Sequence, residues 1–354
     1  MGNLAITYQH IANILSFETS KSKLEKSLSN TAFDWDAIVV EGSRHLVLPA
    51  IYCRLQSKQL LHTLPEELKT YLDKITSINR NRNKSILKQV NSIAQLLNRH
   101  HIDHTFIKGS ALIAAGYYED FAERMIGDID ILVAHNQLDS AYKILKDNDY
   151  IPIEQTLGEQ FFEHKHLPRL KPKDHICAVE IHRKLFVSYK VEELKNENIL
   201  LKKRQKNNIS IPSQTHLLMH NILNYQVNDK GTLYNSINLR SAYDTIVLQR
   251  DYNTKPNWYN YKIIKRYFKY TSLFFNDIKI TTKTKSNLST SFYIYKLNHT
   301  TFYKSWNQLL TFLSFIKILC HRLYFVMRNK SYRNLIIKDR KRIYRHFLST
   351  INNL

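Results

Sequence analysis

The chain contains little cysteine, and its cysteines form no recognisable motif. Cys53, Cys177 and Cys320 lie far apart, with no CxxC pair among them. Disulfide frameworks and zinc sites need several cysteines at short or regular spacings, so neither is predicted. The pattern favours free, buried thiols in a reducing compartment, and we expect a cytoplasmic protein.

The sequence also lacks a targeting segment and a long apolar run. Its start has no positively charged region followed by an apolar stretch, so we expect no signal peptide. The longest apolar candidate, residues 309–320, contains Lys317 and falls short of the ~18 residues that cross a bilayer. We therefore expect a soluble protein with no transmembrane segment.

Several familiar motifs of catalysis and binding are missing as well. The chain has no P-loop and no GxGxxG loop for phosphate binding, and no GxSxG sequence that would mark a nucleophilic serine. His164, His166 and His182 lack a cysteine or a third regularly spaced ligand, so we interpret them as lining a cleft or facing solvent rather than as a zinc site. No recognised nucleic-acid-binding motif is present either.

Acidic residues are scarce in the C-terminal third of the chain. Residues 251–354 contain 20 Lys and Arg but only 3 Asp, and they carry most of the formal net charge of +22. This segment is also rich in Tyr and Phe. Such a composition predicts attraction to a polyanion, for example nucleic acid, an anionic membrane surface or a phosphorylated carrier. A solvated helical surface without a single partner is the alternative.

The hydrophobic pattern predicts helices at both ends of the chain and short strands between them. Apolar residues recur at three- and four-residue steps before residue 100, and one helix is expected over residues 35–55 with a bend near Pro49. Helical spacing returns after about residue 193. Strands are expected near residues 105–107, 127–133, 150–153, 160–166 and 176–186.

We therefore expect an α/β (α+β) fold, with a small mixed-sheet core flanked by N-terminal and C-terminal helical regions. A length of 354 residues suggests two or three domains. The expected division is a helical region at 1–101, a core at 102–190, a helical region at 191–281, and a basic, aromatic-rich helical region at 282–354.

The strand expected at residues 127–133 carries two acidic residues. Asp128 and Asp130 alternate with Ile129, Ile131 and Val133, so both carboxylates share one face while the apolar side chains pack on the other. Two adjacent like charges repel each other unless a cation lies between them. Carboxylate oxygens suit Mg²⁺, which proteins hold with one or two carboxylates together with substrate phosphates.

The turn expected at Gly109 and Ser110 has features of a phosphate-binding site. A glycine allows the backbone to approach a phosphate closely, and the amides at the start of the following helix favour an anion. The Ser110 hydroxyl adds a further donor. Lys108 and Arg124 are placed to neutralise phosphate oxygens, although a solvated strand end and a structural ion pair are the respective alternatives.

A third acidic residue, Glu180, lies on the strand expected at residues 176–186. Val179 and Ile181 would face the core, so Glu180 and His182 share the opposite face. If this strand neighbours the one that carries Asp128 and Asp130, the three carboxylates form a cluster. Two-metal phosphoryl transfer needs such a set of anionic ligands. An exposed residue at a strand edge is the alternative for Glu180.

These residues resemble the DNA polymerase β-like nucleotidyltransferase superfamily, which combines a Gly-Ser turn, an Asp-x-Asp strand and a later acidic strand residue. More narrowly, Lys108-Gly109-Ser110, Arg124 and residues 127–133 look like a bacterial family of largely uncharacterised nucleotidyltransferases. The sequence Glu180-Ile181-His182 is similar to a Glu-Leu-His strand of that family. The match covers about residues 104–186.

The resemblance implies a metal-dependent enzyme that transfers a nucleoside monophosphate from an NTP, such as ATP, to a hydroxyl group and releases pyrophosphate. Asp128, Asp130 and Glu180 would be the catalytic residues and the ligands of Mg²⁺ or Mn²⁺. Gly109 and Ser110 would bind the nucleotide, together with Lys108 and Arg124.

The acceptor cannot be read from the motif, and a nucleic-acid end, a sugar, a small metabolite and a protein side chain all remain open. Two other classes of function also remain open. The same fold could serve a non-catalytic nucleotide-binding protein, or the basic C-terminal third could bind nucleic acid.

Overall fold

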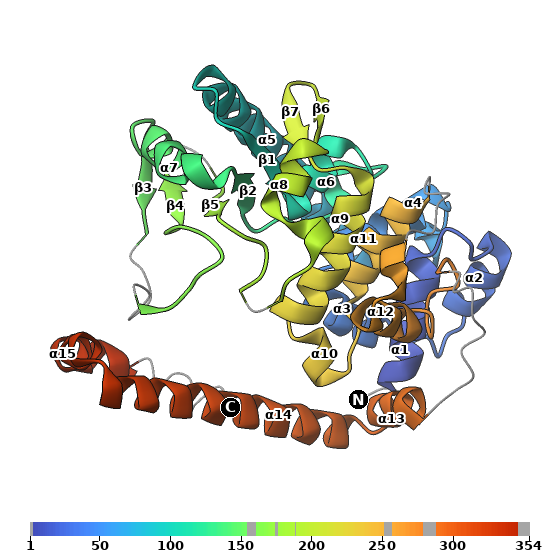
Figure 1. Cartoon of the computed structure of the whole chain (residues 1–354). Coiled ribbons are helices and arrows are strands. Elements are labelled where there is room, and N and C mark those ends of the chain that lie inside the picture. Colours follow the sequence, from blue (N-terminus) through green and yellow to red (C-terminus); the bar gives the residue numbers. More distant parts are fainter. Residues whose placement is uncertain are drawn as a thin grey trace. The chain divides into compact units, whose positions relative to one another are not determined.

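The computed structural model describes residues 3–153, 161–173, 176–187, 189–250, 257–278 and 288–345. Its helices flank a mixed five-stranded sheet and a small two-stranded sheet, which confirms the expected α+β fold (Figure 1). The chain divides into two compact units. The first comprises Met1–Ile153 and Lys165–Asn298, and the second comprises Glu154–His164 and His299–Leu354.

The first unit begins with a group of helices. They are α1 (Leu4–Leu15), α2 (Lys21–Leu28), α3 (Trp35–Arg44), α4 (Leu48–Ser57) and α5 (Glu66–Arg99). The Asn3 side chain caps α1 by accepting hydrogen bonds from two backbone amides. Pro49 lies in the first turn of α4, where its missing N–H costs nothing. Two helices therefore replace the single bent helix expected over residues 35–55.

The main sheet has the strand order β1-β2-β5-β4-β3. Its strands are β1 (His104–Ile107), β2 (Ile129–Val133), β3 (Tyr150–Pro152), β4 (Leu170–Pro172) and β5 (Val179–His182). β2 pairs antiparallel with β1 and parallel with β5. Every residue of β1, β2 and β5 is buried, so these three strands form the centre of the core.

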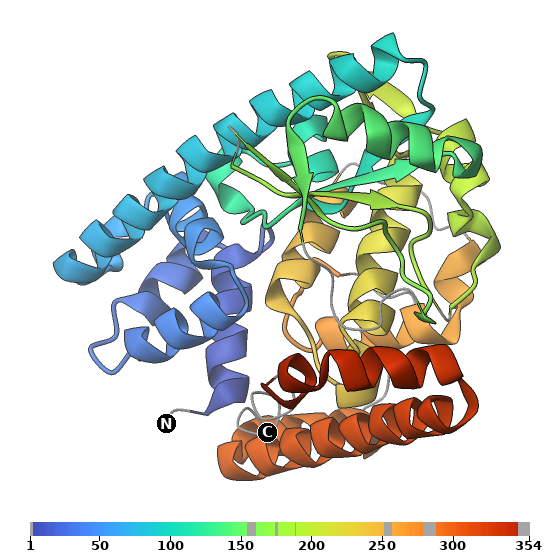
Figure 2. The same ribbon diagram turned by 90° about the vertical axis from the view of Figure 1, so that its left-hand side faces the viewer.

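Two helices accompany this sheet, α6 (Lys108–Ala115) and α7 (Leu138–Lys146). The long helix α5 contacts both of them and also α4, so it joins the N-terminal helices to the sheet (Figure 2). Four polar side chains on α5 face the protein rather than solvent, and three of them bind the backbone that precedes β2. They are Asn79, Arg82, Asn83 and Gln89.

A hairpin and six helices complete the first unit. β6 (Arg204–Lys206) and β7 (Ile209–Ile211) meet at Asn207 and Asn208, which both have positive φ angles, as a tight hairpin turn requires. The helices are α8 (Asn196–Leu201), α9 (Gln214–Leu223), α10 (Gly231–Tyr234), α11 (Leu239–Gln249), α12 (Lys262–Thr271) and α13 (Leu288–Asn298).

Several expected strand boundaries are wrong. Residues 161–166 contain only an isolated bridge between His166 and His182 instead of a strand, and residue 160 lies outside the described residues. The strand β4 was not expected at all. The strand expected at 176–186 is confirmed only at its centre, as β5.

The second unit contains α14 (Thr300–Arg328) and α15 (Lys330–Lys338). Within the described part of the chain, α14 is the one helix long and apolar enough to cross a bilayer by length and composition. The expectation that no uninterrupted apolar run reaches that length stands, because Lys317 and Arg322 lie within α14, but the helix itself continues on both sides of residues 309–320. Length and composition do not distinguish a membrane span from a helix at a surface.

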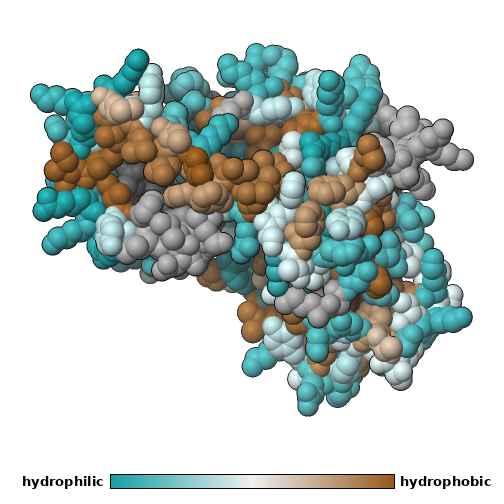
Figure 3. Space-filling view, turned by 90° about the horizontal axis from the view of Figure 1, so that it is seen from below, coloured by the Kyte–Doolittle hydropathy of each residue, from teal (hydrophilic) through white to brown (hydrophobic). Residues whose placement is uncertain are grey.

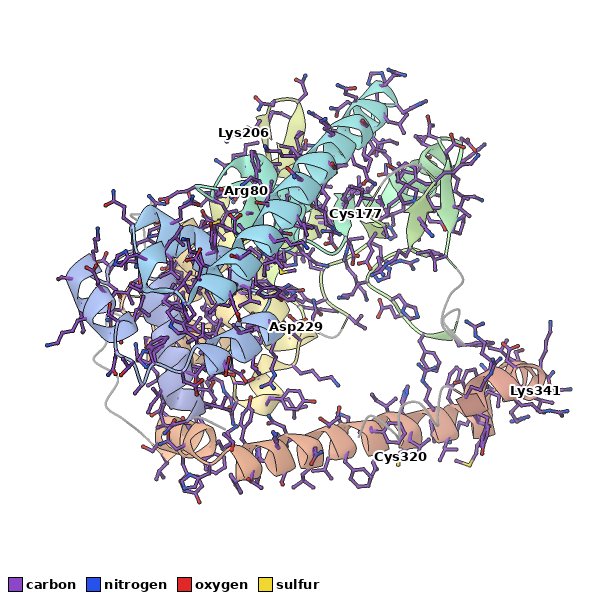
Figure 4. The ribbon with its side chains drawn as sticks, turned by 180° about the vertical axis from the view of Figure 1, so that it is seen from behind. Arg80, Cys177, Lys206, Asp229, Cys320 and Lys341 are labelled. Carbon is purple, nitrogen blue, oxygen red and sulfur yellow. The ribbon has the colours of Figure 1, made fainter. Side chains whose placement is uncertain are left out.

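The three cysteines are free. Cys53 and Cys177 are buried as expected, whereas Cys320 on α14 is exposed (Figure 4).

Candidate active site

Asp130 and Glu180 lie side by side at the centre of the sheet. The parallel pairing of β2 with β5 places Asp130 directly opposite Glu180, so both side chains project from the same face. Each strand buries apolar neighbours on the other face, which fixes this register because a slip of one residue would turn the carboxylates into the core. Two residues 50 positions apart in the sequence thus form an acidic pair.

His182 completes a buried group with these two carboxylates. One ligand atom each from Asp130, Glu180 and His182 lies within 4.8 Å of the others. The His182 Nε2 atom is 2.8 Å from Asp130 and 3.5 Å from Glu180, while its Nδ1 faces the Lys184 carbonyl at 3.4 Å. A histidine held through Nδ1 can present Nε2 to a metal ion.

Asp128 stands apart from this group, immediately before β2. Its side chain is about one-third exposed, and Arg169 links it to Glu180. The Nη2 of Arg169 donates to Asp128 at 2.9 Å and to Glu180 at 2.6 Å. Asp130 and Glu180 therefore come together, and Asp128 is joined to Glu180 through the Arg169 guanidinium.

Lys108 supplies the second cation of the cluster. Its ammonium donates to Asp130 at 2.5 Å from the first residue of α6. Lys108 adopts a positive φ of 56°, which is uncommon for a residue with a side chain and indicates a locally constrained backbone. This conformation joins β1 to α6 without an intervening loop and directs the lysine to the acidic pair.

Charge balance determines the ionisation of these groups. Burial would raise the pKa of Asp130, but the Lys108 charge and the hydrogen bond from His182 hold it below its usual value. Burial likewise acts to raise the pKa of Glu180, and its interactions with His182 and Arg169 lower it overall. The pKa of Asp128 is raised, because burial outweighs the attraction of Arg169. Asp130 and Glu180 are therefore carboxylates at neutral pH.

Gly109 and Ser110 lie inside the first turn of α6 rather than in a turn before it. The Ser110 hydroxyl donates to the Ile107 carbonyl at 3.0 Å, and its side chain is buried. A Cβ at position 109 would lie 3.3 Å from the Ile126 side chain, so glycine allows this helix to pack closely against the loop before β2. Both residues thus have a structural role at the start of the helix.

Arg124 is engaged with protein groups. Its Nε donates to Asp244 on α11 at 3.0 Å, and Tyr118 donates to the other Asp244 oxygen at 2.6 Å. Burial alone would lower the pKa of Arg124, but the Asp244 charge raises it. The structure therefore places Arg124 in a buried ion pair between the loop before β2 and α11. The i,i+4 spacing of Arg240 and Asp244 in the sequence predicts an intrahelical salt bridge, whereas the structure pairs Asp244 with Arg124.

Two further cations, Lys165 and Arg240, lie near Asp229, and Lys165 is also close enough to Asp130 and Glu180 for their charges to affect it. Within the described residues, Lys165 and Arg240 make no side-chain hydrogen bond or ion pair. Burial and the charge of Lys108 lower the pKa of Lys165, while burial and the charge of Arg124 lower the pKa of Arg240. Asp229, which Figure 4 labels, is close enough to both for their charges to oppose the rise that burial causes in its pKa.

Sequence reasoning missed Arg169 and Lys165, considered Arg240 only as an intrahelical partner of Asp244, and gave His182 no role in the cluster. Arg169 precedes β4, a strand of three residues that includes Pro172 and shows no hydrophobic alternation. The sequence could have predicted that His182 lies near Asp130, because His182 is two residues from Glu180 on the same strand and therefore shares its face. Lys165 carries no local signal, and the i,i+4 spacing of Arg240 from Asp244 indicates only an ion pair within a helix.

Carboxylates that can hold divalent metal ions, beside lysine and arginine side chains that can bind phosphates, are typical of enzymes that transfer phosphoryl or nucleotidyl groups. The chain belongs to a family described as uncharacterised nucleotidyltransferase, whose model matches residues 31–269. This confirms the resemblance noted in the sequence and extends it into the flanking helices. A comparison with curated proteins finds no match.

Proposed function

We propose that the protein transfers a nucleoside monophosphate from an NTP to an acceptor hydroxyl and releases pyrophosphate. Family membership supports nucleotidyl transfer in general. The observation that carries the specific proposal is the pairing of Asp130 with Glu180 on adjacent strands, beside Asp128 and His182. We place the protein in the cytoplasm and take ATP as the first nucleotide to test.

The carboxylates fit a divalent metal. Asp130 and Glu180 are ionised and buried, and Lys108 and Arg169 balance their negative charge. Both of these side chains are long and flexible, so a metal ion could displace their charged groups from the carboxylates. Asp128, Asp130 and Glu180 would hold Mg²⁺ or Mn²⁺ through oxygen, and a His182 nitrogen would favour Mn²⁺. When bound, the metal would neutralise phosphate charge and activate the acceptor hydroxyl.

The cations around the site suit a triphosphate. Lys108 and Arg169 already lie at the carboxylates, and an incoming triphosphate offers them alternative anionic partners. Lys165 and Arg240 are partly buried cations, a costly arrangement that an anionic ligand would stabilise. We assign the triphosphate to these four residues, with Gly109 and Ser110 shaping the helix N-terminus beside it. Arg124 then supports the site through Asp244.

Glu180 is better suited to be a metal ligand than a general base. Its lowered pKa keeps it ionised at neutral pH, so it can accept a hydrogen bond from the acceptor hydroxyl but binds a proton weakly. The acceptor proton would therefore pass onward to solvent.

The test is label transfer from an α-phosphate-labelled NTP into a cell extract, with each of the four nucleotides in turn. Wild-type protein should label one class of product with one preferred nucleotide. Asp130→Asn should abolish labelling with the fold intact, because the substitution removes the central charge. Asp139→Asn on the exposed start of α7 is the matched control and should label normally. Equal labelling by Asp130→Asn would overturn the proposal.

A non-catalytic nucleotide-binding protein is the second candidate, favoured by the cations that already occupy the carboxylates. In that case NTP would bind and its phosphates would compete with Asp130 for Lys108, but no extract component would become labelled with any nucleotide.

A further inference from the structure

The helix α14 carries an apolar stripe that is exposed along its length. None of its 29 residues is buried. Six large apolar side chains recur at steps of one, three, four and seven residues, which places them on one face of a helix. They are Leu309, Phe312, Leu313, Ile316, Leu323 and Met327, and each is between 37% and 70% exposed.

The opposite face of α14 is the one that contacts the rest of its unit. Phe325 packs edge-on against Phe161 and Tyr332, and the Arg322 guanidinium lies 3.5 Å from the Phe162 ring centre. Helical geometry places Phe325 and Arg322 away from the stripe. The stripe therefore lies on the face of α14 away from these contacts, and Ile318, which shares the face of Phe325, is also exposed. Figure 3 shows a band of apolar side chains on the face seen from below.

The charge around this stripe is of one sign. Residues 288–338 contain eight Lys and Arg and no Asp or Glu. Lys317 and Arg328 border the stripe on α14, and α15 adds further basic side chains. Beyond Asp339 come Arg340, Lys341 and Arg342, and Figure 4 labels Lys341 at the end of this helical segment.

Three possible occupants fit this surface poorly. A second copy of the helix would bring two basic segments together, with no acidic side chain at the flanking positions to pair with Lys317. Nucleic acid would match the charge but leave the apolar stripe in water. A membrane span would bury Lys317 and Arg322 near the middle of the hydrocarbon core, where charged groups are costly.

We propose that α14 and α15 bind in the plane of a membrane surface that contains anionic lipids. The stripe would enter the boundary between head groups and acyl chains, while Lys317 and Arg328 reach outward to lipid phosphates. The charge of residues 288–338 supplies the attraction to anionic head groups. This inference does not depend on nucleotidyl transfer, because none of its residues belongs to the candidate active site.

The experiment is flotation of the full-length protein with vesicles of phosphatidylcholine alone or mixed with phosphatidylserine. Wild-type protein should float with the mixed vesicles and much less with the neutral ones, and high salt should release it. Lys317→Gln should weaken binding roughly fivefold, and Lys317→Gln with Arg328→Gln correspondingly more. Leu313→Gln with Ile316→Gln should weaken it by more than about tenfold, since buried apolar area is lost.

Matched controls use exposed residues of the first unit. Leu201→Gln on α8 removes an apolar side chain that is 80% exposed, and Lys23→Gln on α2 removes an exposed charge. Both should bind vesicles as wild type does, and circular dichroism should show unchanged helix content in every variant.

Four results would overturn the inference. One is the absence of binding to mixed vesicles, and another is equal binding to both vesicle types. The third is binding that survives extraction at high salt and alkaline pH, as a spanning helix would show. The fourth is a protein dimer or salt-sensitive RNA binding that the Leu313 and Ile316 substitutions abolish, without vesicle binding.

Discussion

At the scale of single residues, Arg169 determines how available the carboxylates are. Its guanidinium donates hydrogen bonds to Asp128 and Glu180 at once, so it would compete with a divalent ion for these carboxylates. Glu180 is largely buried, whereas the Arg169 side chain is 43% exposed and can move into solvent. Displacement of Arg169 from these carboxylates by metal and triphosphate would fit the proposed reaction.

Arg169→Met should therefore tighten Mn²⁺ binding in the absence of nucleotide and weaken nucleotidyl transfer. We expect about a tenfold gain in Mn²⁺ affinity, because a charge-assisted hydrogen-bonded partner no longer competes. Titration followed by electron paramagnetic resonance measures this affinity directly. Arg183→Met, at an exposed arginine just after β5, is the control and should leave Mn²⁺ affinity unchanged. Unchanged or weaker Mn²⁺ binding in Arg169→Met would show that Arg169 does not compete for these carboxylates.

At the scale of elements, α5 sets the position of the Asp-x-Asp strand. The buried Asn83 amide donates to the Phe121 carbonyl at 2.6 Å and to the Arg124 carbonyl at 2.7 Å. Gln89 exchanges two hydrogen bonds with the backbone of Cys177, just before β5. One helix thus holds the entries to both strands that carry the acidic pair.

Asn83→Ala should lower the free energy of unfolding by about 2 kcal/mol, because the Phe121 and Arg124 carbonyls lose the hydrogen bonds from this buried amide, and the Arg124 carbonyl keeps Asn79 as a donor at 3.4 Å. It should also reduce nucleotidyl transfer, since the loop that leads to Asp128 is no longer fixed. Urea denaturation measures the first effect. Asn81→Ala on the exposed side of the same helix is the control and should change stability little. A stability equal to wild type in Asn83→Ala would mean that the loop is held by other contacts.

Alternating polar and apolar residues in the sequence were enough to predict the two strands that carry the acidic pair. The alternation from Asp128 to Val133 predicted β2, and Val179 and Ile181 predicted β5. The register of these two strands had to be assumed, because it depends on residues about 50 positions apart. β4 was missed because three residues with Pro172 show no periodicity, and Arg169 was missed with it. Asn83 reads as an ordinary polar helix residue until its neighbours are known. The catalytic roles assigned to the site residues remain predictions.

At the scale of the whole molecule, His45 links three helices of the first unit. Its Nε2 lies 3.0 Å from the Tyr8 hydroxyl of α1, and its Nδ1 accepts from the Leu239 amide of α11 at 3.4 Å. Burial, followed by the charges of Arg44 and Arg240, lowers the pKa of His45 to about 4. This neutral histidine belongs to the packing of α1, α3 and α11, so its protonation affects global stability.

The pH dependence of stability follows from this shift. Between about pH 6.5 and 4 the unfolded chain binds a proton at His45 and the folded protein does not, so stability falls as the pH falls. This group should account for a loss of about 2 kcal/mol between pH 7 and pH 5. Burial raises the pKa of neighbouring Glu41, so protonation of Glu41 makes stability rise as the pH falls. The contribution of His45 is therefore isolated by comparing wild type with His45→Asn. Denaturation at both pH values should show a smaller loss in the variant. Parallel pH dependence would contradict the assignment.

The central claim is that Asp130 and Glu180 act as one unit in nucleotidyl transfer. Its most direct test is the rate of label transfer from an α-labelled NTP for Asp130→Asn, Glu180→Gln and the double variant. The account predicts that each single substitution lowers the rate at least about a thousandfold and that the double variant is no worse than either. A single variant with near wild-type transfer, or losses that multiply in the double variant, would contradict it.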